Sequence, residues 1–473
     1  MSVRLLGLNE VQGSLIALDH VENVSNEEMV EIELANGQTK DGRVVQIEGD
    51  KAIIQVFQGT DGLSKTNTKT KLLGHPMTLG LSKEILGRTF NGIGKPIDGL
   101  GEIFPEKYED VNGKPLNPVS RQYPRNYIQT GVSAIDGLNT LIRGQKLPIF
   151  SGNGLPHDDL AIQIVKQAKL TGEDTDNFCI VFGAMGVKND VADHFRSSFE
   201  ETGVMDNVAM FINLSDDPIL ERIMTPRCAL TAAEYLAYEK GMNVLVILTD
   251  MTSYCEAVRE FSSSKGEIPS RKGYPGYLYS DLACLYERAG IVKGGKGSVT
   301  QIPILTMPND DITHPVPDLT GYITEGQIVL DRDLFMNGIN PPIGVLSSLS
   351  RLMKDGIGEG YTRADHQDVS NQLFAAYAKV QDAKALASVI GEDELSDLDK
   401  SYMEFGRKFE NIFVGQGNDT NRSMIDTLKL GWALLSTLPV EALDRLDKKL
   451  IDQYYDPEHA ERTIDLICKK GVN

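Results

Sequence analysis

The sequence predicts an α/β protein in three parts: a small N-terminal β-barrel, a central domain built on a parallel sheet, and a C-terminal helical bundle. Three observations support this prediction. Short segments rich in Val and Ile alternate with tight turns in residues 1–75, strand-like and helix-like segments alternate in residues 76–355, and only helical periodicity is present in residues 356–473. A chain of 473 residues is long enough for about two to four domains.

The N-terminal part contains short strand-like segments, namely Val11–Leu18, Met29–Leu34, Gly42–Ile47 and Lys51–Phe57. The dipeptides Asn36-Gly37 and Gly49-Asp50 lie between them, and such pairs favour two-residue hairpin turns. Several short strands joined in this way are typical of a small closed barrel, with a single open sheet as the alternative.

The central part alternates between apolar strands and helices. The predicted strands are Lys146–Phe150, Phe178–Gly183, Val208–Leu214, Asn243–Asp250 and Val299–Met307, and the predicted helices are Asp158–Leu170 and Ala229–Lys240. This alternation indicates βαβ units and a mostly parallel sheet, which binds ligands at the carboxyl ends of its strands.

The C-terminal part carries helical periodicity in Gln367–Val389, Glu394–Phe413 and Asn421–Leu438. Gly391, the segment Gly415–Gly417 and Pro439 separate these segments, as expected of residues that end helices. We therefore expect a helical bundle.

Charge and composition exclude several classes of function. The 47 basic and 67 acidic residues give a net charge of −20, which opposes a nucleic-acid binder or a direct binder of anionic membranes. No apolar run is long enough for a transmembrane helix, and Met1–Arg4 lacks a signal-peptide pattern. The five cysteines form no CxxC pair, so we expect reduced thiols and no metal site.

The segment from Phe150 to Leu160 joins a strand to a helix, where a phosphate-binding loop would lie. Such a loop needs free N–H groups, a lysine for the phosphates and a Ser or Thr for magnesium. Gly152 and Gly154 remain, but Pro156 lacks an N–H, and His157 and Asp158 stand where the lysine and the hydroxyl are needed.

This replacement changes the sign of the loop's charge, because two carboxylates now stand where a polyphosphate would bind. Like charges ~4 Å apart repel by about 4 kcal/mol at an effective dielectric constant near 20. The sequence therefore predicts a degenerate phosphate loop. An ordinary strand–turn–helix with acidic residues in the first helical turn is a compatible interpretation.

Two further positions fit a lost catalytic site. Asp250 ends an apolar strand, as does the aspartate that holds magnesium through water in phosphate-loop proteins. Val187 lies near the position where catalytic relatives have a glutamate that activates water, and a valine side chain cannot act as a base.

Six stretches spread over nearly the whole chain closely resemble one family: Gln129–Asp136, Arg143–Gly152, Leu230–Gly241, Gly273–Tyr279, Gly297–Pro303 and Leu349–Lys354. The family is that of the non-catalytic B subunits of V-type and archaeal A-type rotary ATPases. The resemblance implies an N-terminal β-barrel, a RecA-like central domain and a C-terminal helical domain. The degenerate loop separates B from the catalytic A subunit, which is expected to keep Gly-Lys-Thr/Ser.

The resemblance also implies partners and site residues. Three B subunits are expected to alternate with three A subunits in a ring on the cytoplasmic side of a membrane. Central and peripheral stalk subunits are expected to connect the ring to a membrane partner, and ATP hydrolysis or synthesis in the ring is coupled to H⁺ or Na⁺ translocation. ATP or ADP with Mg is expected at the A–B interface, bound mainly by A. Arg351 and Ser350 of this chain are expected to contact that nucleotide, and Arg351 is expected to act there in trans. The acidic turn Asp393, Glu394, Leu395, Ser396 and Asp397 resembles the family motif that contacts the rotor stalk. An ordinary helix N-terminus, capped by Ser396 or Asp393, is the alternative interpretation.

One departure from the family pattern lies before this arginine, where Pro341-Pro342-Ile343 is followed by Gly344 in place of the usual aspartate. We expect a more flexible loop there.

Two alternatives to a non-catalytic ring subunit are a hexameric RNA helicase and, third, an intact catalytic subunit. Both need an intact phosphate loop and a catalytic glutamate, which this sequence lacks.

Overall fold

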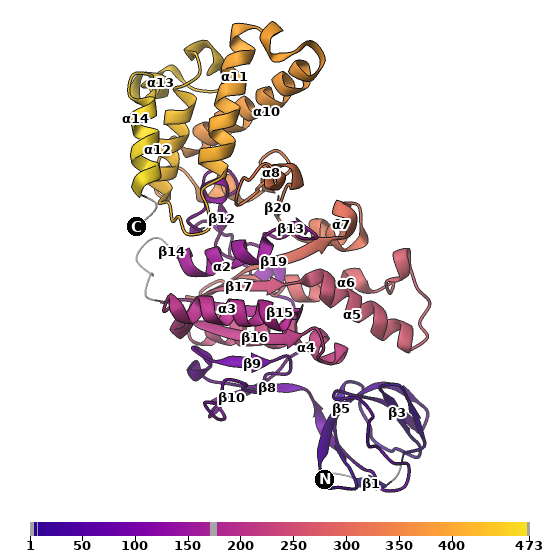
Figure 1. Ribbon diagram of the computed structural model, residues 1–473. Coiled ribbons are helices and arrows are strands. Elements are labelled where there is room, and N and C mark those ends of the chain that lie inside the picture. Colours follow the sequence, from indigo (N-terminus) through magenta and orange to yellow (C-terminus); the bar gives the residue numbers. More distant parts are fainter. Residues whose placement is uncertain (1–3, 7, 171–176, 471–473) are drawn as a thin grey trace.

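The computed structural model describes residues 4–6, 8–170 and 177–470. The chain forms a barrel, a central α/β domain and a helical domain in sequence order, with the barrel and the helical domain at opposite ends of the molecule (Figure 1). Among the described residues, no helix combines the length and apolar character that crossing a membrane requires.

The N-terminal sheet rolls into the predicted barrel (Figure 1). Its strands pair in the order β1-β7-β4-β5-β6-β3-β2, all antiparallel. Their bounds are β1 (Arg4–Leu6), β2 (Glu10–Gln12), β3 (Leu15–Leu18), β4 (Glu28–Glu33), β5 (Thr39–Glu48), β6 (Lys51–Val56) and β7 (Lys69–Pro76). The predicted strand Val11–Leu18 is wrong as one element, because Gly13, at φ +58°, turns the chain between β2 and β3.

The central domain is built on a sheet with the strand order β21-β20-β13-β19-β17-β15-β16-β9. These strands are β9 (Thr89–Asn91), β13 (Ile149–Gly152), β15 (Phe178–Val187), β16 (Val208–Leu214), β17 (Asn243–Thr249), β19 (Ser298–Met307), β20 (Gly326–Val329) and β21 (Leu349–Ser350). The neighbours are parallel except that β21 runs antiparallel to β20. The carboxyl ends of β13, β15 and β17 therefore lie at one edge.

Short strands accompany this sheet. β18 (Gly290–Ile291) pairs antiparallel with β19, β8 (Thr78–Leu81) pairs with β10 (Lys107–Asp110), and β11 (Tyr127–Gln129) lies between β12 (Leu141–Ile142) and β14 (Lys169–Leu170). The predicted helix Asp158–Leu170 is therefore too long. α2 (His157–Gln167) ends where Ala168 turns to an extended conformation and Leu170 pairs with Ile128.

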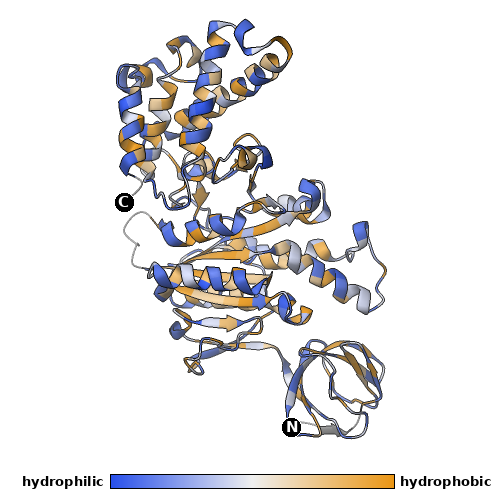
Figure 2. Cartoon of the chain, in the orientation of Figure 1, coloured by the Kyte–Doolittle hydropathy of each residue, from blue (hydrophilic) through white to orange (hydrophobic). Residues whose placement is uncertain are grey.

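Helices cover both faces of the central sheet, and alternate residues of β15 show which residues face each side. Phe182 packs against Phe195 and Phe199 of α3 (Asn189–Glu201), with ring centroids 4.6 and 5.4 Å away. Cys179 and Val181 belong to the core on the other face, beside α4 (Ile219–Glu234), α5 (Met251–Ser264) and α6 (Leu278–Tyr286). Figure 2 shows that the strands of this sheet form the most hydrophobic layer of the central domain.

The predicted helix Ala229–Lys240 has the wrong start. α4 begins at Ile219, continues through Pro226, and is followed by a π-helical turn, Tyr235–Glu239. Proline ordinarily breaks a helix, but α4 is buried on nearly all sides, and tertiary packing overrides that local preference. Shorter helices of this domain are α1 (Ser133–Asp136), α7 (Pro315–Ile323), α8 (Arg332–Met336) and α9 (Met353–Gly356).

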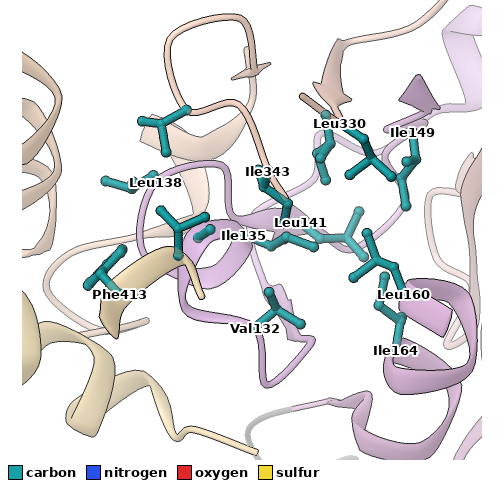
Figure 3. Close-up of a cluster of buried hydrophobic side chains, with 14 of the residues drawn as sticks. Val132, Ile135, Leu138, Leu141, Ile149, Leu160, Ile164, Leu330, Ile343 and Phe413 are labelled. Carbon is teal, nitrogen blue, oxygen red and sulfur yellow. The ribbon is translucent and has the colours of Figure 1, made fainter. Parts of the chain in front are cut away.

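The helical domain contains α10 (His366–Ile390), α11 (Asp397–Lys408) with a π-helical extension Phe409–Val414, and α12 (Met424–Leu435), close to the predicted segments. The sequence prediction missed α13 (Lys448–Tyr454) and α14 (Ala460–Lys470). Phe413 packs into the same buried cluster as Val132, Ile135 and Leu138 of the central domain (Figure 3). The two domains therefore share one hydrophobic core.

Candidate functional site

The loop between β13 and α2 bonds to itself. The Leu155 N–H donates to the Gly152 carbonyl (3.1 Å), the His157 N–H donates to the Leu155 carbonyl (2.9 Å), and Pro156 has no N–H. Gly154 adopts φ +79°, which permits this tight turn. The N–H groups of Leu155 and His157 are thus used within the loop rather than offered to a phosphate.

An ion pair lies against the same loop. Arg332 donates from Nε and Nη2 to the two carboxylate oxygens of Asp310, at 2.5 and 2.8 Å, and its Nη2 also donates to the Asn153 carbonyl at 2.9 Å. A Cβ atom on Gly152 would lie only 1.9 Å from Asp310 Oδ1. The space next to Gly152 is therefore filled by protein, a feature that sequence reasoning missed.

His157 is anchored on the loop as well. Its Nδ1 lies 3.1 Å from Ser151 Oγ and 3.0 Å from the Leu155 carbonyl, and its Nε2 lies 3.7 Å from Asp158 Oδ1. A phosphate-loop lysine would instead extend toward the phosphates as a free cation. The histidine does not reproduce this role.

Two carboxylates interact at this edge of the sheet. Asp250 accepts hydrogen bonds from the Thr252 N–H (2.8 Å), the Thr306 N–H (3.1 Å) and Thr306 Oγ1 (2.5 Å). Burial raises the pKa of Asp250, and burial with the nearby Asp250 charge raises the pKa of Asp158. Val187 ends β15 and brings no acid or base. These residues do not fit magnesium-bound polyphosphate.

Arg351 lies at a different place in the central domain, directly after β21. Its side chain is exposed, and within residues 4–6, 8–170 and 177–470 its guanidinium has neither a hydrogen bond nor an ion pair. It lines a cleft of about 830 Å³ between the central and helical domains. The guanidinium is thus available to a group from outside the chain.

The cleft around Arg351 is basic although the chain as a whole is acidic. Its lining includes Lys354, Lys379 and Arg445, which sequence reasoning missed, and two acidic residues, Asp382 and Asp444. These residues come from α9, from α10 and from the segment after α12, so only the folded chain brings them together. Four basic groups against two acidic ones favour an anionic ligand.

The Ser350 hydroxyl is used inside the domain. Ser350 is 8% exposed, and its Oγ accepts from Gln145 Nε2 and donates to the Thr140 carbonyl, both at 3.0 Å. These bonds fix the strand that leads to Arg351 and leave the hydroxyl without a free donor. This geometry gives no support to the prediction that Ser350 contacts a nucleotide.

The loop at Gly344 is fixed by hydrogen bonds. The Gly344 N–H donates to the Val329 carbonyl (2.8 Å), and the Gly344 carbonyl accepts from the hydroxyls of Ser347 (3.1 Å) and Ser348 (2.7 Å). These bonds hold the loop in place and give no support to the prediction of a more flexible loop.

The acidic turn lies between α10 and α11, at the end of the helical domain away from the sheet (Figure 1). Leu395 is buried, whereas Asp393, Glu394, Ser396 and Asp397 are exposed. Ser396 caps α11 by accepting from the Asp399 N–H at 3.1 Å, as the ordinary interpretation of a helix start predicts. No group of three or more metal-ligating side chains occurs in the described part of the chain.

Comparison with family models covers most of the chain. Residues 9–74 match the ATP synthase alpha/beta family, beta-barrel domain, and residues 131–350 match the nucleotide-binding domain of the same family. Residues 355–455 match the C-terminal domain of V and A type ATP synthase.

Individual proteins are similar over nearly their full length. The V-type ATP synthase beta chain 2 of Clostridium tetani is 63% identical over 456 residues, covering 96% of this chain and 99% of the relative. The V-type ATP synthase beta chain of Thermotoga neapolitana is 57% identical, covering 95% and 97%. A solved structure, described as a unique ATP synthase subunit NeqB from Nanoarcheaum equitans, has a TM-score of 0.71 at 40% identity, covering 90% of this chain and 100% of that one.

Proposed function

The chain belongs to the family of V-type ATP synthase beta chains, and from this premise we propose that it is the non-catalytic B subunit of a rotary ring. In this proposal it alternates with catalytic A subunits, and the nucleotide site lies at the A–B interface, mainly on A. The chain itself turns over no ATP.

The contrast between its two sites is the observation that carries this proposal. Its own loop is closed by the Asp310–Arg332 pair and faces the carboxylates of Asp158 and Asp250, so it repels magnesium-bound polyphosphate. Arg351, in turn, presents an unpaired guanidinium at a basic cleft on the surface. An unpaired, exposed arginine, on a chain whose own phosphate loop is degenerate, suits a role at a neighbour's nucleotide.

The role of Arg351 follows from the chemistry of phosphoryl transfer. Negative charge spreads over the oxygens of the transferred group, and a planar guanidinium with fixed donors stabilises that charge. Such an arginine supplied in trans contributes about 10³–10⁵ in rate in other phosphoryl-transfer systems. Lys354, Lys379 and Arg445 add positive potential around it.

Coupling to ion movement requires contact with moving parts outside this chain. We assign the exposed acidic turn from Asp393 to Asp397 to a contact with the rotor stalk. Two observations support this assignment: the turn lies at the outer end of the helical domain, and it is negatively charged. Peripheral stalk subunits and a membrane sector that carries H⁺ or Na⁺ complete the complex. The chain is then a peripheral component on the cytoplasmic side.

Mixing this chain with its catalytic partner tests the proposal. Native mass and ATPase rate are measured for the chain alone, the partner alone and the mixture. We expect an alternating hexamer and full turnover only in the mixture, with no turnover by this chain alone. Turnover by the isolated chain, or no complex with the partner, would refute it.

A further inference from the structure

Gln145 lies in the connection between β12 and β13 and bonds to the segment that carries Arg351, and we propose that it is a positioning residue for that arginine. The inference rests on the proposed role of Arg351 in trans. It assigns to a buried amide, which contacts no substrate, the task of fixing the main chain at residue 351.

The amide of Gln145 makes bonds to both sides of this segment. Its Nε2 donates to Ser350 Oγ at 3.0 Å and to the Glu325 carbonyl at 3.3 Å. The same Glu325 carbonyl accepts the Arg351 N–H at 2.9 Å. One amide therefore contacts the residue before Arg351 and the acceptor that Arg351 itself uses.

Gln145 is itself immobile. It is fully buried, its Oε1 accepts from the Ile142 N–H at 2.9 Å, and its carbonyl accepts from the Gln301 N–H at 2.9 Å on β19. An amide bonded at both its nitrogen and its oxygen has one orientation. Gln145 can therefore hold residues 350 and 351 at a fixed position relative to the central sheet.

The acceptor at Glu325 is anchored as well. Lys146, 3% exposed, pairs with Glu325 Oε1 and with Glu287 Oε1, both at 2.8 Å, and its N–H donates to Glu325 Oε2 at 2.8 Å. At Gly326 a Cβ would lie 2.0 Å from the Leu349 carbonyl, so β20 and β21 approach closely there. The segment before Arg351 is thus held at several points, while the guanidinium of Arg351 stays free.

The physical reason for such a support is the geometric demand of catalysis. A displacement of about 1 Å can lower a rate by about 10²-fold. Gln145→Leu keeps the size of the side chain and removes its bonds to Ser350 and Glu325. In the reconstituted ring we expect kcat to fall about tenfold, KM to stay unchanged, and affinity for ADP with aluminium fluoride to fall while affinity for Mg-ADP does not.

A double-mutant cycle separates positioning from general damage. If Gln145 acts through Arg351, Gln145→Leu lowers kcat in the wild-type ring and causes no further loss in a ring carrying Arg351→Ala. An equal loss in both backgrounds would overturn the inference while leaving the proposed function intact. A normal rate for Arg351→Ala alone would refute the proposed function, and the inference with it.

Gln163→Leu is the matched control. Gln163 is 1% exposed and its Nε2 donates to the Gly417 and Thr420 carbonyls, both at 3.1 Å, but it has no bond to residues 349–351. We expect it to lower stability without lowering kcat. Ser350→Ala serves if Gln145→Leu does not fold, because it removes one acceptor of the same amide. A normal kcat for Ser350→Ala in that case would overturn the inference.

Discussion

Acidification is expected to weaken the junction between the central and helical domains through one buried histidine. His366 is the first residue of α10 and is fully buried. Its Nε2 lies 3.0 Å from the Gly137 carbonyl and its Nδ1 lies 3.1 Å from Thr362 Oγ1. Because a carbonyl can only accept, Nε2 carries the proton and Nδ1 accepts from the threonine hydroxyl. The native ring is neutral.

The magnitude follows from the pKa difference between the two states. Burial lowers the pKa of His366 from 6.5 to about 4. The Gly137 bond and Asp365 oppose this shift, and Arg363 adds to it. Between pH 6.5 and 4 the unfolded chain binds the extra proton and the native chain does not, so the free energy of unfolding falls as pH falls. The loss totals about 3 kcal/mol and is absent above pH 6.5.

The single tryptophan gives a direct assay. Trp432 in α12 is buried, and its Nε1 donates to Asp365 next to His366 at 2.6 Å. Urea unfolding followed by its fluorescence, at pH 7.5 and at pH 4.5, is compared between the wild type and His366→Gln. The control is His459→Gln, whose side chain is 59% exposed.

The wild type is expected to lose about 2–3 kcal/mol more than His366→Gln between these pH values. Although burial alone would raise it, bonds from Arg363 and Trp432 lower the pKa of Asp365, so its own contribution is lost only below about pH 4. Parallel losses in the wild type and in His366→Gln would refute the reasoning.

Three further changes test the packing and charge of the structure. Phe182→Ala removes a fully buried ring and is expected to lower the free energy of unfolding by about 3–5 kcal/mol in urea titrations; a loss below 1 kcal/mol would contradict the packing. Burial and the Asp250 charge raise the pKa of Asp158, so the ionised carboxylate destabilises the native chain increasingly as pH rises above 3.8. Asp158→Asn is therefore expected to raise the free energy of unfolding at pH 7, and a lower value there would contradict this. Ser396→Ala removes the cap of α11 and is expected to cost about 1 kcal/mol by the same assay; an unchanged midpoint would count against the cap.

The strands of the central sheet could be predicted from the sequence because their burial on both faces requires continuous apolar runs. β16 has the bounds predicted for it, Val208–Leu214. Elements whose limits depend on distant partners could not be placed in this way. α2 stops at Gln167 because β14 pairs with β11, and α4 passes through Pro226 because its neighbours enclose it.

The same distinction applies to the site. Residue types alone indicate that the loop has lost its phosphate donors, since Pro156 and Asp158 lie only two and four residues after Gly154. The Asp310–Arg332 pair joins residues 22 apart, and its arginine bonds to Asn153, which lies 179 residues earlier in the chain. Likewise the basic lining around Arg351 comes from separate helices. Local sequence carries no signal for such contacts.

The most direct test of the account is the ATPase rate of the ring reconstituted with Arg351→Ala. Arg351→Lys, which keeps the charge but not the planar fork, and Arg196→Ala, an exposed arginine on α3, serve as comparison and control. We expect intact hexamers, a kcat lowered about 10³-fold or more by the alanine, and normal turnover for Arg196→Ala. A hexamer carrying Arg351→Ala that turns over ATP at the normal rate would contradict the claim that this chain completes its neighbour's active site.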